Sequence, residues 1–146
     1  MQALTLSDIR EAVERICNKV KGSEELYDYC MDMGLYRDAR FLVSSEISGA
    51  ARNPKEYMES MGWDTSDITL ELEECIDLNL TFEPEDVLVV MEELGEEVRK
   101  ILEERPTTRL YEAIHEAMYE DDVSDALSNV IARRLLRAIE ECKGKK

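Results

Sequence analysis

The sequence predicts an all-α fold, a compact bundle of seven to eight helices in a single domain. Three observations predict it: apolar residues recur at helical spacing along most of the chain, capping residues and prolines stand where helices would begin, and the intervening segments are short. With 146 residues, 44% of them hydrophobic, the chain is long enough to bury one core. We expect the domain over residues 1–142 and a basic tail over residues 143–146.

The first two helices have clear start and stop signals. Thr5 is a good N-cap because Asp8 follows three residues later and can complete a capping box. Ser23 is an N-cap for the second helix. Gly22 and Gly34 are expected to end these two helices, since glycine readily adopts the left-handed conformation found after a helix.

A third helix is expected over residues 35–51, and a short fourth helix follows it. Asn53 and Pro54 mark the start of the fourth helix, because proline suits the first helical position, where no N–H donor is needed. Gly62 is expected to end it.

Residues 68–82 fit two structures. Their apolar residues alternate with period two, which is typical of a short β-hairpin, but several of them also share one face of a helix. The segment is rich in Glu and has no Gly, Asn or Pro at the turn that a hairpin would need. We therefore predict a helix here, with a hairpin as the alternative.

Three further helices complete the bundle. Pro84 begins a long helix that ends before Pro106. Thr107 or Thr108 is expected to cap the next helix, and the Asp pair at 121–122 is expected to interrupt the pattern. The last helix is expected over residues 123–142.

The charge of the chain is unevenly distributed. The formal net charge is −16, yet residues 56–97 contain 15 acids and no Lys or Arg, while residues 132–146 hold six bases and two acids, a net +4. An acidic field repels phosphate backbones and anionic lipids and attracts basic protein surfaces. We therefore expect no direct nucleic-acid binding and no membrane role. No apolar run approaches the roughly 18–20 residues of a membrane helix.

The four cysteines, Cys17, Cys30, Cys75 and Cys142, match no zinc-binding spacing. The first residues lack the basic and apolar regions of a signal peptide. We therefore expect a cytoplasmic protein with reduced, buried thiols. Spacing does not show whether any two cysteines lie within about 7 Å, the Cα separation that a disulfide needs.

Two other motifs resemble metal sites. Glu112 and His115 have the ExxH spacing of carboxylate di-iron bundles, but the only histidine of the chain cannot supply the second such unit. Cys30 and Met33 place sulfur ligands three residues apart, as a copper(I) site would. We interpret His115 as a surface or partly buried residue and the sulfur pair as core packing.

Carboxylates recur in two motifs, EExxD at residues 73–77 and ExxE at residues 93–96, with 15 residues between them. At helical spacing each motif places its acids on one side of a helix, and two such faces apposed would suit Mg²⁺. Over residues 63–97 the chain resembles the MazG-type all-α nucleotide pyrophosphohydrolases, which carry EExxE and ExxD on consecutive helices. The resemblance implies catalysis through Glu93 and a Mg²⁺ ion held by Glu73, Glu74, Asp77, Glu93 and Glu96.

We predict first a non-enzymatic function without a cofactor: an acidic helical protein that docks on a basic surface of a protein partner through residues 56–97. A nucleic-acid mimic is a special case, and a subunit of a complex or a homo-oligomer fits equally. The Mg²⁺-dependent hydrolase is the alternative. The predicted partner-binding residues are Trp63, Asp64, Asp67, Glu71, Glu83, Glu85 and Asp86, with Leu78, Leu80 and Phe82 as further apolar anchors if they are exposed.

Overall fold

The computed structural model describes residues 4–144, which form eight helices and no strand. This confirms the all-α prediction. The helices are α1 (Leu6–Asn18), α2 (Glu24–Met31), α3 (Gly34–Arg52), α4 (Pro54–Ser60), α5 (Leu70–Asn79), α6 (Pro84–Glu104), α7 (Leu110–Ala117) and α8 (Asp121–Gly144). Within residues 68–82, α5 makes residues 70–79 helical, so the predicted helix is confirmed and the alternative hairpin is wrong.

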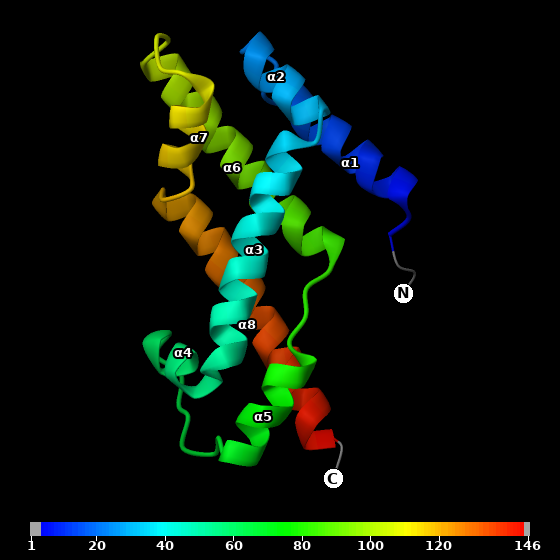
Figure 1. The fold of residues 1–146 in the computed structure, drawn as a ribbon, viewed down its shortest axis with the longest axis vertical. Helices are drawn as coiled ribbons and strands as arrows, with labels where there is room; N and C mark the ends of the chain where they lie inside the picture. The colour runs from blue at the N-terminus through cyan, green and yellow to red at the C-terminus, as the bar shows by residue number, and fades with distance from the viewer. Residues whose placement is uncertain (1–3, 145–146) are drawn as a thin grey trace.

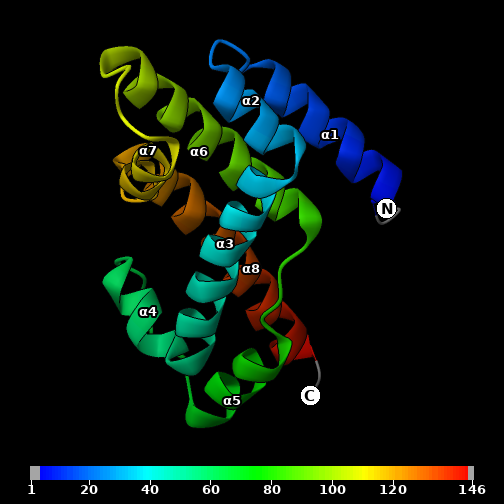
Figure 2. The ribbon, with the colours of Figure 1, turned by 45° about the horizontal axis from the view of Figure 1, so that its top comes forward.

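Helix α3 runs through the centre of the molecule and packs on both α6 and α8 (Figure 1). Around one end of it lie α1, α2 and α7: α1 packs on α2 and α6, and α7 packs on α6. Helices α4 and α5 lie at the opposite end, where α4 contacts α3 and α5 contacts α8 (Figure 2). The two acidic motifs lie on α5 and α6, which make no substantial contact with each other.

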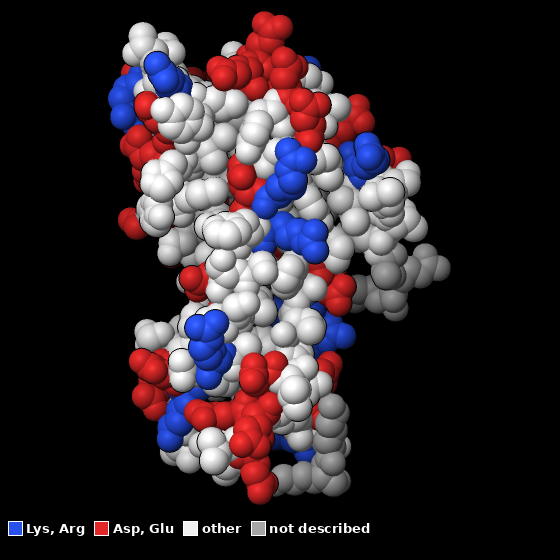
Figure 3. All heavy atoms as spheres, viewed as in Figure 1, with Lys and Arg blue, Asp and Glu red and all other residues white. Residues whose placement is uncertain are grey.

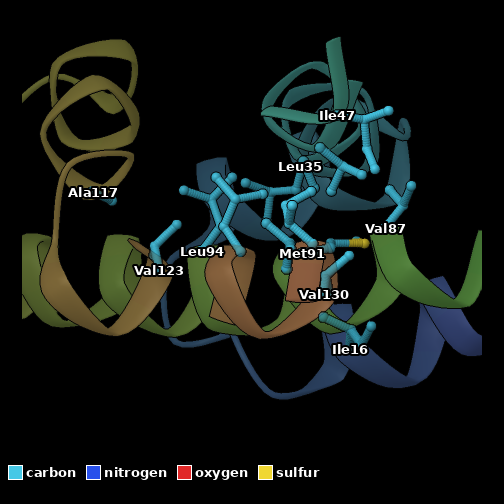
Figure 4. Packing of buried hydrophobic residues seen from close by; sticks show 14 of the residues in the cluster. Ile16, Leu35, Ile47, Val87, Met91, Leu94, Ala117, Val123 and Val130 are labelled. Carbon is cyan, nitrogen blue, oxygen red and sulfur yellow. The ribbon is translucent and has the colours of Figure 1, made fainter. Parts of the chain in front are cut away.

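One continuous hydrophobic core joins the helices (Figure 4). Leu35 of α3 and Met91 and Leu94 of α6 are fully buried at its centre. Gly95 of α6 lies against Leu35 and Val20, and a Cβ atom there would lie 3.4 Å from a methyl of each. Among the described helices, none is long and apolar enough to cross a bilayer.

Several predicted helix starts are confirmed. The backbone N–H of Asp8 donates to the Thr5 hydroxyl at 3.1 Å, and the Thr5 N–H donates back to the Asp8 carboxylate at 3.0 Å. Ser23 caps α2, accepting from the N–H of Leu26 at 3.3 Å. Helices α4 and α6 begin at Pro54 and Pro84, the first helical residues expected from the sequence.

Other boundaries differ from the prediction. The left-handed residue between α2 and α3 is Met33, with φ 71°, and not Gly34. Gly34 begins α3. A Cβ atom at this position would lie 2.7 Å from Cδ1 of Tyr29, so only glycine leaves room for the tyrosine ring. The N-cap of α7 is Arg109, and neither Thr107 nor Thr108.

The last helix is longer at both ends than expected. The Asp pair at 121–122 forms the first turn of α8, where carboxylates favour the helix dipole. The helix continues through Lys143 to Gly144, so the expected basic tail is partly helical. Residues 145–146 of that tail lie outside the described residues.

The expectation of reduced thiols is wrong for this structure, in which all four cysteines are paired. Cys17 and Cys30 join α1 to α2 with their Cα atoms 5.6 Å apart, and Cys75 and Cys142 join α5 to the end of α8 with their Cα atoms 5.9 Å apart. Each pair lies where two helices pack side by side. Sequence spacing does not reveal such packing, and the second pair is separated by 67 residues.

Candidate docking surface

The 15 acids of residues 56–97 fall into two groups in the structure. Eight lie on α4, on α5 or on the connection between them, and are called here the α4–α5 acids: Glu56, Glu59, Asp64, Asp67, Glu71, Glu73, Glu74 and Asp77. Seven lie on or just before α6 and are called the α6 acids: Glu83, Glu85, Asp86, Glu92, Glu93, Glu96 and Glu97.

The α4–α5 acids are open to solvent. Seven of the eight are exposed, and Glu73 is half-buried. None of them forms an ion pair with any residue in the described part of the chain. Figure 3 shows acidic side chains gathered over α4 and α5 at the lower end of the molecule, with some basic side chains on the same face. This end therefore presents exposed acids that form no ion pair within the described chain.

The connection between α4 and α5 is held by local hydrogen bonds. Gly62 ends the α4 segment with φ 83°, a conformation that favours glycine. The buried Thr65 hydroxyl donates to Glu59 at 2.9 Å. The Asp64 carboxylate accepts from the backbone N–H of Ser66 at 3.0 Å, and this hydrogen bond lowers the pKa of Asp64. The acids of this connection are thus presented on an ordered turn.

Helix α5 presents a mixed acidic and apolar face to solvent. At 100° per residue its five exposed residues fall within about a third of the helix circumference. These residues are Leu70, Glu71, Glu74, Asp77 and Leu78. Leu70 is 70% exposed and Leu78 is 84% exposed, the largest value among the exposed large hydrophobic residues.

The inner face of α5 packs on α8, α3 and α4 through one buried and several half-buried residues. Ile76 is its only buried residue, while Leu72 and Cys75 are half-buried and pack against the core. Thr69 caps the helix by accepting from the Leu72 N–H at 3.1 Å. This arrangement explains the period-two pattern of residues 68–82, because apolar residues lie on both the core face and the solvent face of one helix.

Most of the α6 acids form ion pairs with bases of α6 itself or of other parts of the chain. Five of the seven form ion pairs: Glu85 and Asp86 with Arg134, Glu92 with Lys19, Glu96 with Arg99, and Glu97 with Lys100. Lys19 follows α1 and Arg134 belongs to α8. The local absence of Lys and Arg in the sequence therefore does not give this segment an open negative surface.

Asp86, one of the predicted partner-binding residues, is buried and paired within the chain and so is not accessible to a partner in this structure. It is 3% exposed, and its Oδ2 atom accepts from Arg134 Nε at 2.6 Å and from the backbone N–H of Glu83 at 2.8 Å. Its role is to cap α6 and to join it to α8. Glu85 is exposed but lies 3.8 Å from a guanidinium nitrogen of Arg134, whereas Glu83 is exposed with no ion pair among the described residues.

One cluster of carboxylates in the described chain could hold a metal ion: Glu93, Glu97 and Asp122, whose ligand atoms lie within 4.8 Å of one another. It borders an open groove of about 650 Å³ between α6 and α8. Burial raises the pKa of Glu97, and the nearby Asp122 carboxylate raises it further, while Lys100 opposes both. The pKa of one carboxylate in the cluster is therefore raised above its usual range.

The structure does not form the five-carboxylate magnesium site implied by the MazG resemblance. Glu93 is the only member of that set in the α6–α8 cluster. Glu73, Glu74 and Asp77 lie on α5, which packs on α8, α3 and α4 and makes no substantial contact with α6. Glu96 forms an ion pair with Arg99, which lowers the pKa of Glu96. The two motifs do not face each other.

The predicted apolar anchors have mixed positions. Leu80 is buried, and Trp63 and Phe82 are half-buried against the core, so of the four only Leu78 is freely exposed. Leu70 was missed by the sequence analysis, although a helical projection of residues 70–79 places it about 80° from Leu78 and about 120° from Ile76.

The remaining motifs carry no site. His115 is exposed and contacts Tyr119 edge to face, with ring centroids 5.3 Å apart. Cys30 is bonded to Cys17, and Met33 packs against the core.

No protein-family model, curated protein sequence or solved structure matches this chain.

Proposed function

We propose that this protein is a non-enzymatic acidic interaction protein whose α4–α5 end docks on a basic surface of a protein partner. One observation carries the proposal: seven exposed acids at that end have no ion pair within the described chain. An open patch of one sign accelerates association with an oppositely charged surface and excludes partners of like charge. The binding residues are the α4–α5 acids, including Asp64, Asp67 and Glu71.

The α6 acids contribute less to this surface. Five of them are already paired within the chain, and a partner cation would have to compete with Lys19, Arg99, Lys100 or Arg134. Glu83 is the α6 acid best placed to join the docking surface, because it is exposed and precedes the helix. The docking surface is thus smaller than the acidic segment 56–97.

The hydrolase alternative has less support. It needs the carboxylates of both motifs around one metal ion, and these lie on α5 and α6, which make no substantial contact with each other. The Glu93, Glu97 and Asp122 cluster lies elsewhere and shares one residue with the expected set. We therefore favour binding over catalysis.

A charge-matched pair of variants tests the proposal. The first variant carries Glu56→Gln, Asp67→Asn, Glu71→Gln and Glu74→Gln, all within the α4–α5 acids. The control carries Glu11→Gln, Glu14→Gln, Glu24→Gln and Glu25→Gln, which remove the same charge from exposed, unpaired acids of α1 and α2. Affinity for fluorescein-labelled polylysine is measured by anisotropy at increasing NaCl concentration.

We expect the α4–α5 variant to lose much more affinity, and more of its salt dependence, than the control. Equal losses in the two variants would show that only the overall charge matters and would contradict a localised docking surface. If added DNA duplex displaces the protein from a natural basic partner, the partner surface is one that holds nucleic acid, as a mimic requires.

A cytoplasmic location remains part of the prediction. Two disulfides are typical of oxidising compartments, whereas thiols in the cytosol are kept reduced. Alkylation of intact cells, followed by counting of free thiols in the purified protein, distinguishes the two environments. Four free thiols agree with a cytoplasmic location, and none agrees with an oxidising compartment.

A further inference from the structure

We propose that the outer face of α5 and the groove beside it receive an amphipathic, basic helix of the protein partner, with apolar side chains placed over Leu70 and Leu78. This inference rests on the proposed function, because it specifies the partner of the same acidic surface. It adds that recognition is apolar as well as electrostatic, and that the partner element is a helix.

Two leucines on one exposed helix face are the first observation. Single exposed leucines are common on protein surfaces. Leu70 and Leu78, however, are eight residues apart on α5, so they lie about 12 Å apart along the same side of the helix. That spacing matches apolar residues about two turns apart on a second helix lying alongside α5.

A groove lies next to this face. It has a volume of about 710 Å³ and separates α5 from the last turns of α8. Leu70, Leu72 and the disulfide between Cys75 and Cys142 give it an apolar lining. The disulfide also ties the two walls together, so the groove is present before a partner binds.

Charge complementarity determines the chemistry of the occupant. Three exposed acids lie between the two leucines along α5: Glu71, Glu74 and Asp77. They form no ion pair within the described chain. Asp67 also lines the groove, and Lys143 is the basic residue in that lining. A segment with Lys or Arg on either side of its apolar residues satisfies both features, whereas an acidic or uncharged helix satisfies only one.

A second copy of the chain is the competing occupant. Phe41 is 67% exposed on α3, and the exposed Arg37 and Arg40 lie on the same helix. This surface is basic and apolar, so the test must separate self-association from binding of a different chain.

The experiment compares two labelled peptides with the same numbers of Lys and Leu. One peptide places all its leucines on one helical face, and the other distributes them around the helix. The test variant is Leu70→Gln with Leu78→Gln, and the control is Leu6→Gln with Leu136→Gln, which alters leucines that are 68% and 51% exposed elsewhere. Circular dichroism checks that both variants are folded, and anisotropy measures binding.

We expect the wild type and the control to bind the amphipathic peptide about tenfold or more tightly than the distributed one. The Leu70 and Leu78 variant should lose this preference and keep the salt-sensitive binding that both peptides share. Absence of any preference in the wild type overturns this inference and leaves the proposed function standing.

Absence of salt-sensitive binding to either peptide overturns the proposed function itself. Analytical ultracentrifugation of the protein alone tests whether the chain self-associates. A concentration-dependent dimer that the Leu70 and Leu78 variant abolishes would assign the face to a second copy and overturn the partner helix.

Discussion

The α4–α5 acids and the α6 acids come from the same acidic segment of the sequence but differ in how many of them form ion pairs. Both groups belong to a segment without Lys or Arg, yet five of the seven α6 acids are paired and none of the eight α4–α5 acids is, within the described chain. The difference has two sources: α6 packs against α1 and α8, which bring Lys19 and Arg134 to it, and α6 itself carries Arg99 and Lys100 just after the acidic segment. Net local charge is therefore a property of the packed helices, and a sequence window does not measure it.

The two regions also differ in how they are held. Helix α6 has nine buried residues and contacts four other helices, α1, α3, α7 and α8. Helix α5 has one buried residue, Ile76, and is tied to α8 by the bond between Cys75 and Cys142. Helix α6 thus buries far more of its residues than α5, which packs on α8, α3 and α4 and is also joined to α8 by a covalent link.

The largest effect is expected where an α6 acid is buried. Arg134→Ala leaves the Asp86 carboxylate without its partner in a site where the two side chains are only 4% and 12% exposed. Leaving one charge of a buried pair uncompensated costs about 3–5 kcal/mol of unfolding free energy. Urea denaturation measures the change.

The matched control for this prediction removes both charges. The double variant Asp86→Asn with Arg134→Met should recover a large part of the loss, because it leaves no buried charge unpaired. Glu74→Gln, in the α4–α5 group, should change the free energy of unfolding by less than about 0.5 kcal/mol. Similar losses for Arg134→Ala and Glu74→Gln would show that the two groups do not differ as described.

The next effect concerns the covalent link of α5. Replacing both Cys75 and Cys142 by Ser removes a bond between residues 67 positions apart and should lower the free energy of unfolding by roughly 2–4 kcal/mol. Hydrogen exchange should become faster in α5 and stay slow in the centre of α6, because the bond joins α5 to the end of α8 and does not involve α6.

The other disulfide supplies the comparison for that measurement. Cys17 and Cys30 are separated by only 13 residues and join α1 to α2, so their replacement should destabilise the protein less and leave exchange in α5 unchanged. Uniform protection of α5 in the Cys75 and Cys142 variant would show that its noncovalent contacts suffice to hold it.

Much of the fold was predictable because local signals determine it. The capping pair of Thr5 and Asp8, and Pro54 and Pro84 at the first helical positions, define helix starts through bonds within a few residues. The errors fell where a distant contact decides the outcome. Gly34 is required by the ring of Tyr29, and the four cysteines pair across packed helices.

The candidate site was predictable only in part. Asp64, Asp67 and Glu71 are exposed as expected, because polar turns and the solvent side of a helix are evident from local pattern. The role of Asp86 was not predictable, since the residue that neutralises it is 48 positions away on α8. Leu80 was wrongly grouped with Leu78, because a period-two pattern does not separate the two faces of a helix.

The smallest expected change in the free energy of unfolding comes from an acid near the C-terminal end of α5. Asp77 is exposed in the last turn of α5, near the negative end of the helix dipole, three and four residues after Glu74 and Glu73. Asp77→Lys should raise the free energy of unfolding by about 0.5–1 kcal/mol, since it reverses the dipole interaction and two like-charge contacts. The same change should weaken binding to polylysine. Asp77→Asn is the control and should give a smaller change of the same sign in both measurements. If Asp77→Lys strengthened binding or lowered stability, the α4–α5 end would not carry the uncompensated charge that separates it from α6.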